Sequence, residues 1–86
     1  MMLRLRSKVR LVRRPRTGAA LLLYPERALE LNATALEVVE LLDGTRTLTD
    51  ICVTIAERHP DAAEDVVNHA VERFVAELRS RALLDP

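Results

Sequence analysis

The sequence predicts an α+β fold in which a three-stranded antiparallel meander at the N-terminus precedes three helices. Before residue 32, apolar and polar side chains alternate with period two, and two proline-containing turns interrupt the alternation. After residue 32, apolar residues recur three and four positions apart. The run LNATALEVVELLDGTRTLTDI, from Leu31 to Ile51, contains a strand end and two capped helices but no catalytic group. It indicates a small recognition module rather than an enzyme.

The first strand is predicted to begin at Leu3 and to have one apolar and one basic face. The apolar face consists of Leu3, Leu5, Val9 and Leu11, and the basic face consists of Arg4, Arg6, Lys8 and Arg10. This alternation is typical of a strand that is covered on one side only.

Two turns define the second and third strands. Pro15 and Gly18 predict a turn after the first strand, because proline lacks a backbone donor and glycine tolerates positive φ. The apolar run 19–24 is predicted as a central strand, and Pro25 begins the next turn at its favoured first corner. The third strand is predicted at residues 27–31, with alternating faces that place Leu29 and Leu31 on the same side.

The first two helices are predicted from their caps. Asn32 or Thr34 can cap the first helix, Thr34 and Glu37 have the spacing of a capping box, and Gly44 is predicted to stop the helix. Its apolar stripe consists of Ala35, Val38, Val39 and Leu42, widened by Leu36 and Leu41. Thr47 is predicted to cap the second helix, which ends before Pro60. Its stripe consists of Leu48, Ile51, Cys52, Ile55 and Ala56.

The third helix is predicted to be the longest, from about residue 62 to residue 82, with Asp61 as its cap. Its predicted apolar face consists of Ala63, Val67, Ala70, Val71, Phe74 and Leu78.

The chain of 86 residues is predicted to form a single domain, residues 1–86, with a small aliphatic core because Tyr24 and Phe74 are the only aromatic residues. A domain of this size buries only about 60–65% of its unfolded surface, so pairing with a partner or into a homodimer would add stability. Net charge is zero, yet residues 1–25 contain seven basic residues and no acid, and residues 26–86 contain thirteen acids and six arginines. Either the two parts neutralise each other in the fold, or the basic part binds an acidic peptide or phosphates.

Catalytic and cofactor chemistry is not expected. The two histidines and Cys52 have no ligand spacing, so no metal site is predicted, and Cys52 is expected to be a buried structural thiol. Two glycines are too few for a phosphate-cradling loop, so no cofactor is expected. The chain has neither a membrane-spanning apolar run nor a signal peptide pattern, and a cytoplasmic location is expected.

Two binding functions remain. Three helices beside strands resemble a winged helix-turn-helix, which would make the protein a nucleic-acid-binding regulator. Against this, the first turn of the third helix is acidic, with Asp61, Glu64 and Asp65, and would repel phosphates. The alternative is peptide capture, in which an extended peptide adds itself as a strand to a free sheet edge beside the third helix. No binding to nucleic acid or membrane is therefore expected.

The whole chain, from about Leu3 to Leu84, resembles the PqqD family of peptide chaperones in pyrroloquinoline quinone assembly, and the leader-binding RiPP recognition elements. The most typical piece is Leu42-Asp43-Gly44 followed by Thr47-Leu48 and Ile51. Further matches are Val9 to Leu11, Ala20 to Arg27, Leu31-Asn32 with Thr34-Ala35 and Glu37-Val38, and the C-terminal Glu77-Leu78 with Leu83-Leu84. Arg58-His59-Pro60-Asp61 is similar to the free-standing leader-binding subunit of lasso-peptide pathways.

The resemblance implies a winged-helix variant that holds the leader of a precursor peptide and presents it to a modifying enzyme, which could be a radical enzyme, a protease or a cyclase. In the family the leader lies as an added strand against the third strand and the third helix. On this chain that implies peptide-binding residues Arg27, Ala28, Leu29, Glu30, Leu31, Val67, Ala70, Val71 and Phe74. Family members often have more aromatic residues in the second strand, where this chain has only Tyr24.

Overall fold

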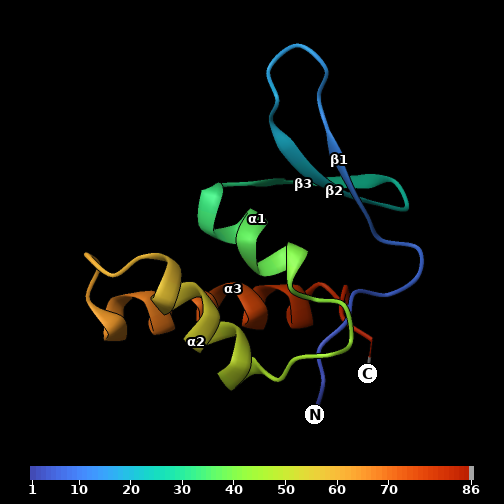
Figure 1. Ribbon diagram of the computed structural model, residues 1–86. Coiled ribbons are helices and arrows are strands. Elements are labelled where there is room, and N and C mark those ends of the chain that lie inside the picture. The colour runs from blue at the N-terminus through green and yellow to red at the C-terminus, as the bar shows by residue number, and fades with distance from the viewer. Residues whose placement is uncertain (86) are drawn as a thin grey trace.

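The computed structural model describes residues 1–85, and Figure 1 shows a β-sheet on one side of a layer of helices. The strands are β1 (Arg10–Arg13), β2 (Ala20–Tyr24) and β3 (Arg27–Leu31), and the helices are α1 (Ala33–Glu40), α2 (Leu48–Arg58) and α3 (Glu64–Ser80). This element order confirms the predicted α+β fold. The N-terminal segment lies beside the chain that follows α3, where the Asp85 N–H donates to the Arg4 carbonyl at 2.8 Å, and both lie far from the β1–β2 turn (Figure 1).

The sheet is antiparallel with order β1-β2-β3, so β2 is central and both β1 and β3 are edges. Leu22 of β2 pairs with Leu11 of β1 and with Leu29 of β3. Paired residues share a face, so these three side chains point toward the helices. Leu22 is completely buried, whereas Leu11, at the edge, is 37% exposed.

The predicted start of the first strand at Leu3 was wrong, because β1 begins at Arg10. A turn at residues 7–8 separates β1 from the N-terminal segment, which pairs with distant parts of the chain instead. Arg4 bridges to Asp43, and Leu5 bridges to Leu84. The alternation was real, since Leu3 is buried and Arg4 exposed. This alternation does not come from pairing within the sheet. Arg4, Arg6 and Lys8 precede β1, so the predicted basic face does not run continuously along one strand.

Caps fix the first two helices. Asn32, and not Thr34, caps α1, because its side chain accepts a hydrogen bond of 2.8 Å from the Ala35 N–H. Thr47 and Asp50 form the predicted capping box of α2, with reciprocal hydrogen bonds of 3.0 and 3.1 Å. As predicted, α2 ends directly before His59-Pro60. Gly44 lies beyond the end of α1, where its φ of +85° directs its N–H to the Leu3 carbonyl.

The third helix differs from the prediction at its start and in its buried face. It begins at Glu64 with Ala63 at the cap position, so Asp61 does not cap it. Its buried residues are Val67, Val71, Val75 and Leu78. Val75 was missed, whereas Ala63 and Ala70 of the predicted face are exposed and Phe74 is partly exposed. The core face is therefore rotated relative to the predicted one.

The end of α3 turns the chain back into the core. Ala82 adopts a left-handed φ of +59°, an unfavourable conformation for any residue with a Cβ. The Ala82 N–H donates to the Arg79 carbonyl at 3.0 Å, and the Leu83 N–H donates to the Leu78 carbonyl at 2.9 Å. These two bonds form a Schellman motif. The motif directs Leu83 and Leu84 into the core, where both are buried.

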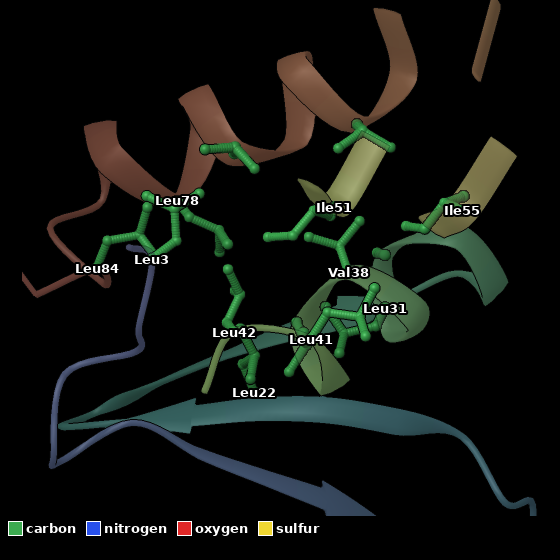
Figure 2. Packing of buried hydrophobic residues seen from close by; sticks show 14 of the residues in the cluster. Leu3, Leu22, Leu31, Val38, Leu41, Leu42, Ile51, Ile55, Leu78 and Leu84 are labelled. Carbon is green, nitrogen blue, oxygen red and sulfur yellow. The ribbon is translucent and has the colours of Figure 1, made fainter. Parts of the chain in front are cut away.

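The core lies between the sheet and the helices. Figure 2 shows Leu22 of β2 facing Leu42, which follows α1, and Val38 of α1 facing Ile51 of α2. Leu78 of α3 lies beside Leu3 and Leu84, which join the two ends of the chain to the core (Figure 2). The core is almost entirely aliphatic, as the composition predicts.

Candidate functional site

Two side chains with reactive chemistry, Cys52 and His59, occupy structural positions in the fold. Cys52 is buried, and burial raises the pKa of its thiol, with a smaller contribution from the Glu72 carboxylate. A thiol with a raised pKa is a poor nucleophile at neutral pH. His59 lies 2.8 Å from Glu37, so it ties α2 to α1. Within residues 1–85, no three His, Cys, Asp or Glu side chains gather as metal ligands would.

The outer edge of β3 presents unpaired backbone groups. The Arg14 N–H donates to the Ala19 carbonyl at 2.9 Å, which fixes the alternation of bonded and non-bonded pairs along the β1–β2 ladder. The register of β2 with its two neighbours continues this alternation into the β2–β3 ladder. The N–H groups of Arg27, Leu29 and Leu31 therefore point toward β2. The N–H and C=O groups of Ala28 and Glu30 therefore point outward from the sheet.

A groove lies on the outer face of α3, next to the end of β3. It has a volume of about 590 Å³. Its lining residues are Asn32, Ala70, Arg73, Phe74, Ala76, Glu77 and Ser80. Because Asn32 directly follows β3, the groove lies between the end of that strand and the exposed side of α3. Apolar contact comes from Ala70 and Phe74, and Arg73 and Glu77 add one charge of each sign.

The nine sequence-predicted residues fall into two groups. Arg27, Ala28, Glu30 and Ala70 are exposed, and Leu29 and Phe74 are partly exposed, so these six side chains are accessible to a peptide. Leu31, Val67 and Val71 are buried in the core, where they hold β3 and α3 in place. The structure thus leaves the strand edge and the Ala70–Phe74 side of α3 as the accessible surface.

Sequence reasoning missed the polar part of the groove. Arg73, Glu77 and Ser80 lie three, seven and ten positions after Ala70, which is the spacing of one helix face. That spacing was visible in the sequence, but charged residues at helical intervals are usually plain solvated surface. Arg81 extends this side of α3 toward the sheet, because its guanidinium lies 3.2 Å from both the Tyr24 hydroxyl and the Glu77 carboxylate.

Known proteins share this architecture. The family model for "Coenzyme PQQ synthesis protein D (PqqD)" matches residues 19–84, which include β2, β3 and all three helices. The chain belongs to the PqqD family. The sequence-based resemblance is thereby confirmed, whereas the similarity to the lasso-peptide type stays a prediction.

Two curated PqqD relatives show how far the similarity extends. A PqqA binding protein of Stutzerimonas stutzeri (strain A1501) is 42% identical over 71 residues, which cover 76% of this chain and 77% of the relative. A PqqA binding protein of Rhizobium meliloti (strain 1021) is 39% identical over 77 residues, which cover 90% of this chain and 78% of the relative.

Two solved PqqD structures have the same fold. The solution structure of the PqqD part of Methylobacterium extorquens PqqCD, described as a functional, stand-alone RiPP recognition element, matches with a TM-score of 0.78 at 27% identity. The match covers 98% of this chain and 88% of that one. The crystal structure of PqqD from Xanthomonas campestris matches with a TM-score of 0.64 at 34% identity, covering 95% and 90% of the two chains. Among residues 1–85, no helix has the length and hydrophobicity needed to cross a bilayer.

Proposed function

We propose that this protein binds the leader segment of a ribosomally made precursor peptide and presents it to a modifying enzyme. The leader adds itself as a strand to the outer edge of β3, and its side chains on the helix-facing side enter the groove on α3. The observation that supports this most strongly is the free N–H and C=O groups of Ala28 and Glu30, beside a groove that Ala70 and Phe74 line.

The family relation indicates the kind of peptide. Curated relatives are PqqA binding proteins, and a solved relative is a RiPP recognition element. We therefore propose a PqqA-type precursor as the ligand, with a lasso-peptide precursor as the specific alternative because of Arg58-His59-Pro60-Asp61. A radical enzyme, a protease or a cyclase fits the partner role, and the recognition protein itself supplies no catalytic group. Cytoplasmic location remains an expectation.

The nucleic-acid alternative is not favoured. The first turn of α3, the candidate recognition helix of a winged helix-turn-helix, carries Glu64 and Asp65, and both are exposed. Carboxylates in that position repel phosphates, and binding to DNA would depend steeply on salt.

Isothermal titration calorimetry tests the proposal. Purified full-length protein is titrated with the PqqA peptide of Stutzerimonas stutzeri, and with the same peptide after its residue order is scrambled. We expect saturable binding of the native peptide only, with little dependence on salt, because backbone bonding and apolar contacts dominate strand addition.

Two further ligands complete the design. A lasso-peptide precursor distinguishes the two leader classes, and a mixed-sequence DNA duplex represents the alternative function. If neither leader binds and the duplex binds tightly with a steep salt dependence, the leader-binding proposal is wrong.

A further inference from the structure

Among residues 1–85, the cations of the β1–β2 hairpin form no ion pairs, and the Arg13 guanidinium donates to the Gly18 carbonyl at 3.1 Å. The hairpin cations are Arg10, Arg13, Arg14 and Arg16, and all four are exposed. Within residues 1–85, the ion pairs formed by carboxylates use other cations, namely Arg4, Arg46, Arg58, His59 and Arg81. The acidic residues of the helices therefore do not pair with the hairpin arginines, whereas Arg4 of the same basic part pairs with Asp85.

The same hairpin contains the second free edge of the sheet. The bond from the Arg14 N–H to the Ala19 carbonyl directs the N–H groups of Arg10 and Val12 toward β2. By the same alternation, the N–H and C=O groups of Leu11 and Arg13 point outward. Leu11 is also 37% exposed, so a strand added here would find apolar contact as well as backbone partners.

This edge is remote from the groove on α3. In the sheet order, β2 separates β1 from β3, and the hairpin projects away from the helices in Figure 1. A segment bound along β1 would not compete with a segment bound along β3. The sheet can thus hold two different strands, one on each side.

We propose that the β1 edge is a second docking surface, which binds an extended acidic segment of a partner protein. Carboxylates of that segment would pair with the hairpin arginines, and its backbone would continue the ladder at Leu11 and Arg13. Nucleic acid offers the negative charge but no alternating N–H and C=O groups, and a membrane surface offers neither a strand nor a ladder. The free ladder therefore favours a protein partner.

Nuclear magnetic resonance on ¹⁵N-labelled full-length protein, without any leader, tests this surface. The probe is an end-capped octapeptide of alternating glutamate and valine, and its control replaces every glutamate with glutamine. The glutamate peptide is expected to shift the amide signals of Leu11 and Arg13. The glutamine peptide should bind at least about fivefold more weakly, and added NaCl should weaken binding of the glutamate peptide.

Variants separate charge from strand addition. Exposed ion pairs each change affinity by roughly 1.4- to 5-fold, so replacing Arg10, Arg13, Arg14 and Arg16 with Gln should weaken peptide binding at least about fourfold. Leu11→Pro removes one ladder donor and should weaken it several-fold without changing the charge.

The control is the double variant Arg58→Gln with Arg79→Gln, which removes two exposed charges outside the hairpin. Its affinity for the glutamate peptide should stay within about twofold of the wild type, because both residues lie outside the proposed surface. Circular dichroism verifies that each variant is folded.

Four results would overturn the proposal. They are no binding at millimolar peptide, equal binding of the glutamate and glutamine peptides, signal changes at Ala28 and Glu30 instead of β1, and wild-type affinity in Leu11→Pro. Tighter binding of a DNA duplex or of anionic phosphatidylserine vesicles than of the glutamate peptide would assign the hairpin to those partners instead. Because the assay contains no leader, its failure leaves the proposed leader site untouched.

Discussion

Replacing Ala28 or Glu30 with proline should weaken leader binding while preserving the fold. Proline has no N–H, so each substitution removes one outward donor from the β3 edge. Neither substitution removes a bond to β2, because the ladder alternation assigns those bonds to the odd-numbered residues of β3. Proline is tolerated at edge positions of this kind.

The magnitude follows from the number of bonds lost. A backbone hydrogen bond contributes about 0.5–1.5 kcal/mol net, so each proline should raise the Kd for the leader roughly 2- to 13-fold. The double variant loses both outward donors, and its Kd should rise by about the product of the two factors if the bonds act independently. Calorimetry with the PqqA peptide measures the Kd, and denaturant unfolding measures stability.

Two controls define the interpretation. Leu29→Pro removes a bond to Leu22 in the interior of the ladder and should destabilise the protein strongly. Leu11→Pro places the same residue on the opposite edge and should leave leader binding unchanged. Wild-type Kd in both Ala28→Pro and Glu30→Pro, with intact circular dichroism spectra, would refute strand addition at β3.

Three other substitutions test separate parts of the account. Ala70→Glu places a charge in the groove at an exposed helix position. The free energy of leader binding, measured by calorimetry, should weaken by at least about 1 kcal/mol. The free energy of unfolding, measured in urea, should change by less than about 0.5 kcal/mol. Ala82→Gly relieves the left-handed φ of +59° and should raise the free energy of unfolding by about 1 kcal/mol. Asp50 has a lowered pKa, chiefly because the Thr47 N–H donates to its carboxylate. Its contribution to stability is therefore present above the unfolded pKa near 3.9 and is lost as pH falls through the lower folded pKa. Asp50→Asn should reduce this loss, as measured by urea unfolding at pH 7 and pH 3.

Each of these expectations can fail in a specific way. Wild-type leader affinity in Ala70→Glu would place the groove outside the binding site. Lower stability in Ala82→Gly would mean that the added freedom of the unfolded chain outweighs the relieved strain. If Asp50→Asn and the wild type lose the same free energy of unfolding between pH 7 and pH 3, the capping box does not cause the acid sensitivity.

The sequence predicted those elements whose signals are local. The third strand was predicted with its observed bounds, Arg27–Leu31, because Pro25 and the alternation after it mark both the turn and the faces. The Thr47 capping box and the stop at Pro60 are contacts within one helix and its flanks, and both were confirmed.

Contacts between distant segments were the source of the errors. Leu3 and Leu5 alternate with arginines as a strand would, but residues 3–5 pair with Arg46, Asp43 and Leu84, and no local pattern reveals a partner so far away along the chain. The buried face of α3 was misjudged for a similar reason. Ala70 and Val75 are both small or apolar and flank the stripe of Val67, Val71 and Leu78 on opposite sides. Only packing against α1 and α2 decides that Val75 is buried.

The candidate site was predictable at the level of elements but not of residues. The family resemblance indicated β3 and α3 as the binding elements. The outward direction of the Ala28 and Glu30 N–H groups could be determined only from the structure, where the bond between Arg14 and Ala19 sets the alternation. The burial of Val67 and Val71 likewise needed the three-dimensional packing, since an apolar residue on a helix can face either the core or a ligand.

Amide hydrogen exchange at single-residue resolution tests the central claim, strand addition at the β3 edge, most directly. In the free protein the outward N–H groups of Ala28 and Glu30 should exchange rapidly, and the Leu29 N–H, bonded to β2, should exchange slowly. Saturation with the leader peptide is predicted to slow exchange at Ala28 and Glu30 by at least about tenfold while the amides of β1 keep their rates. Saturable leader binding with unchanged exchange at both amides would contradict the account.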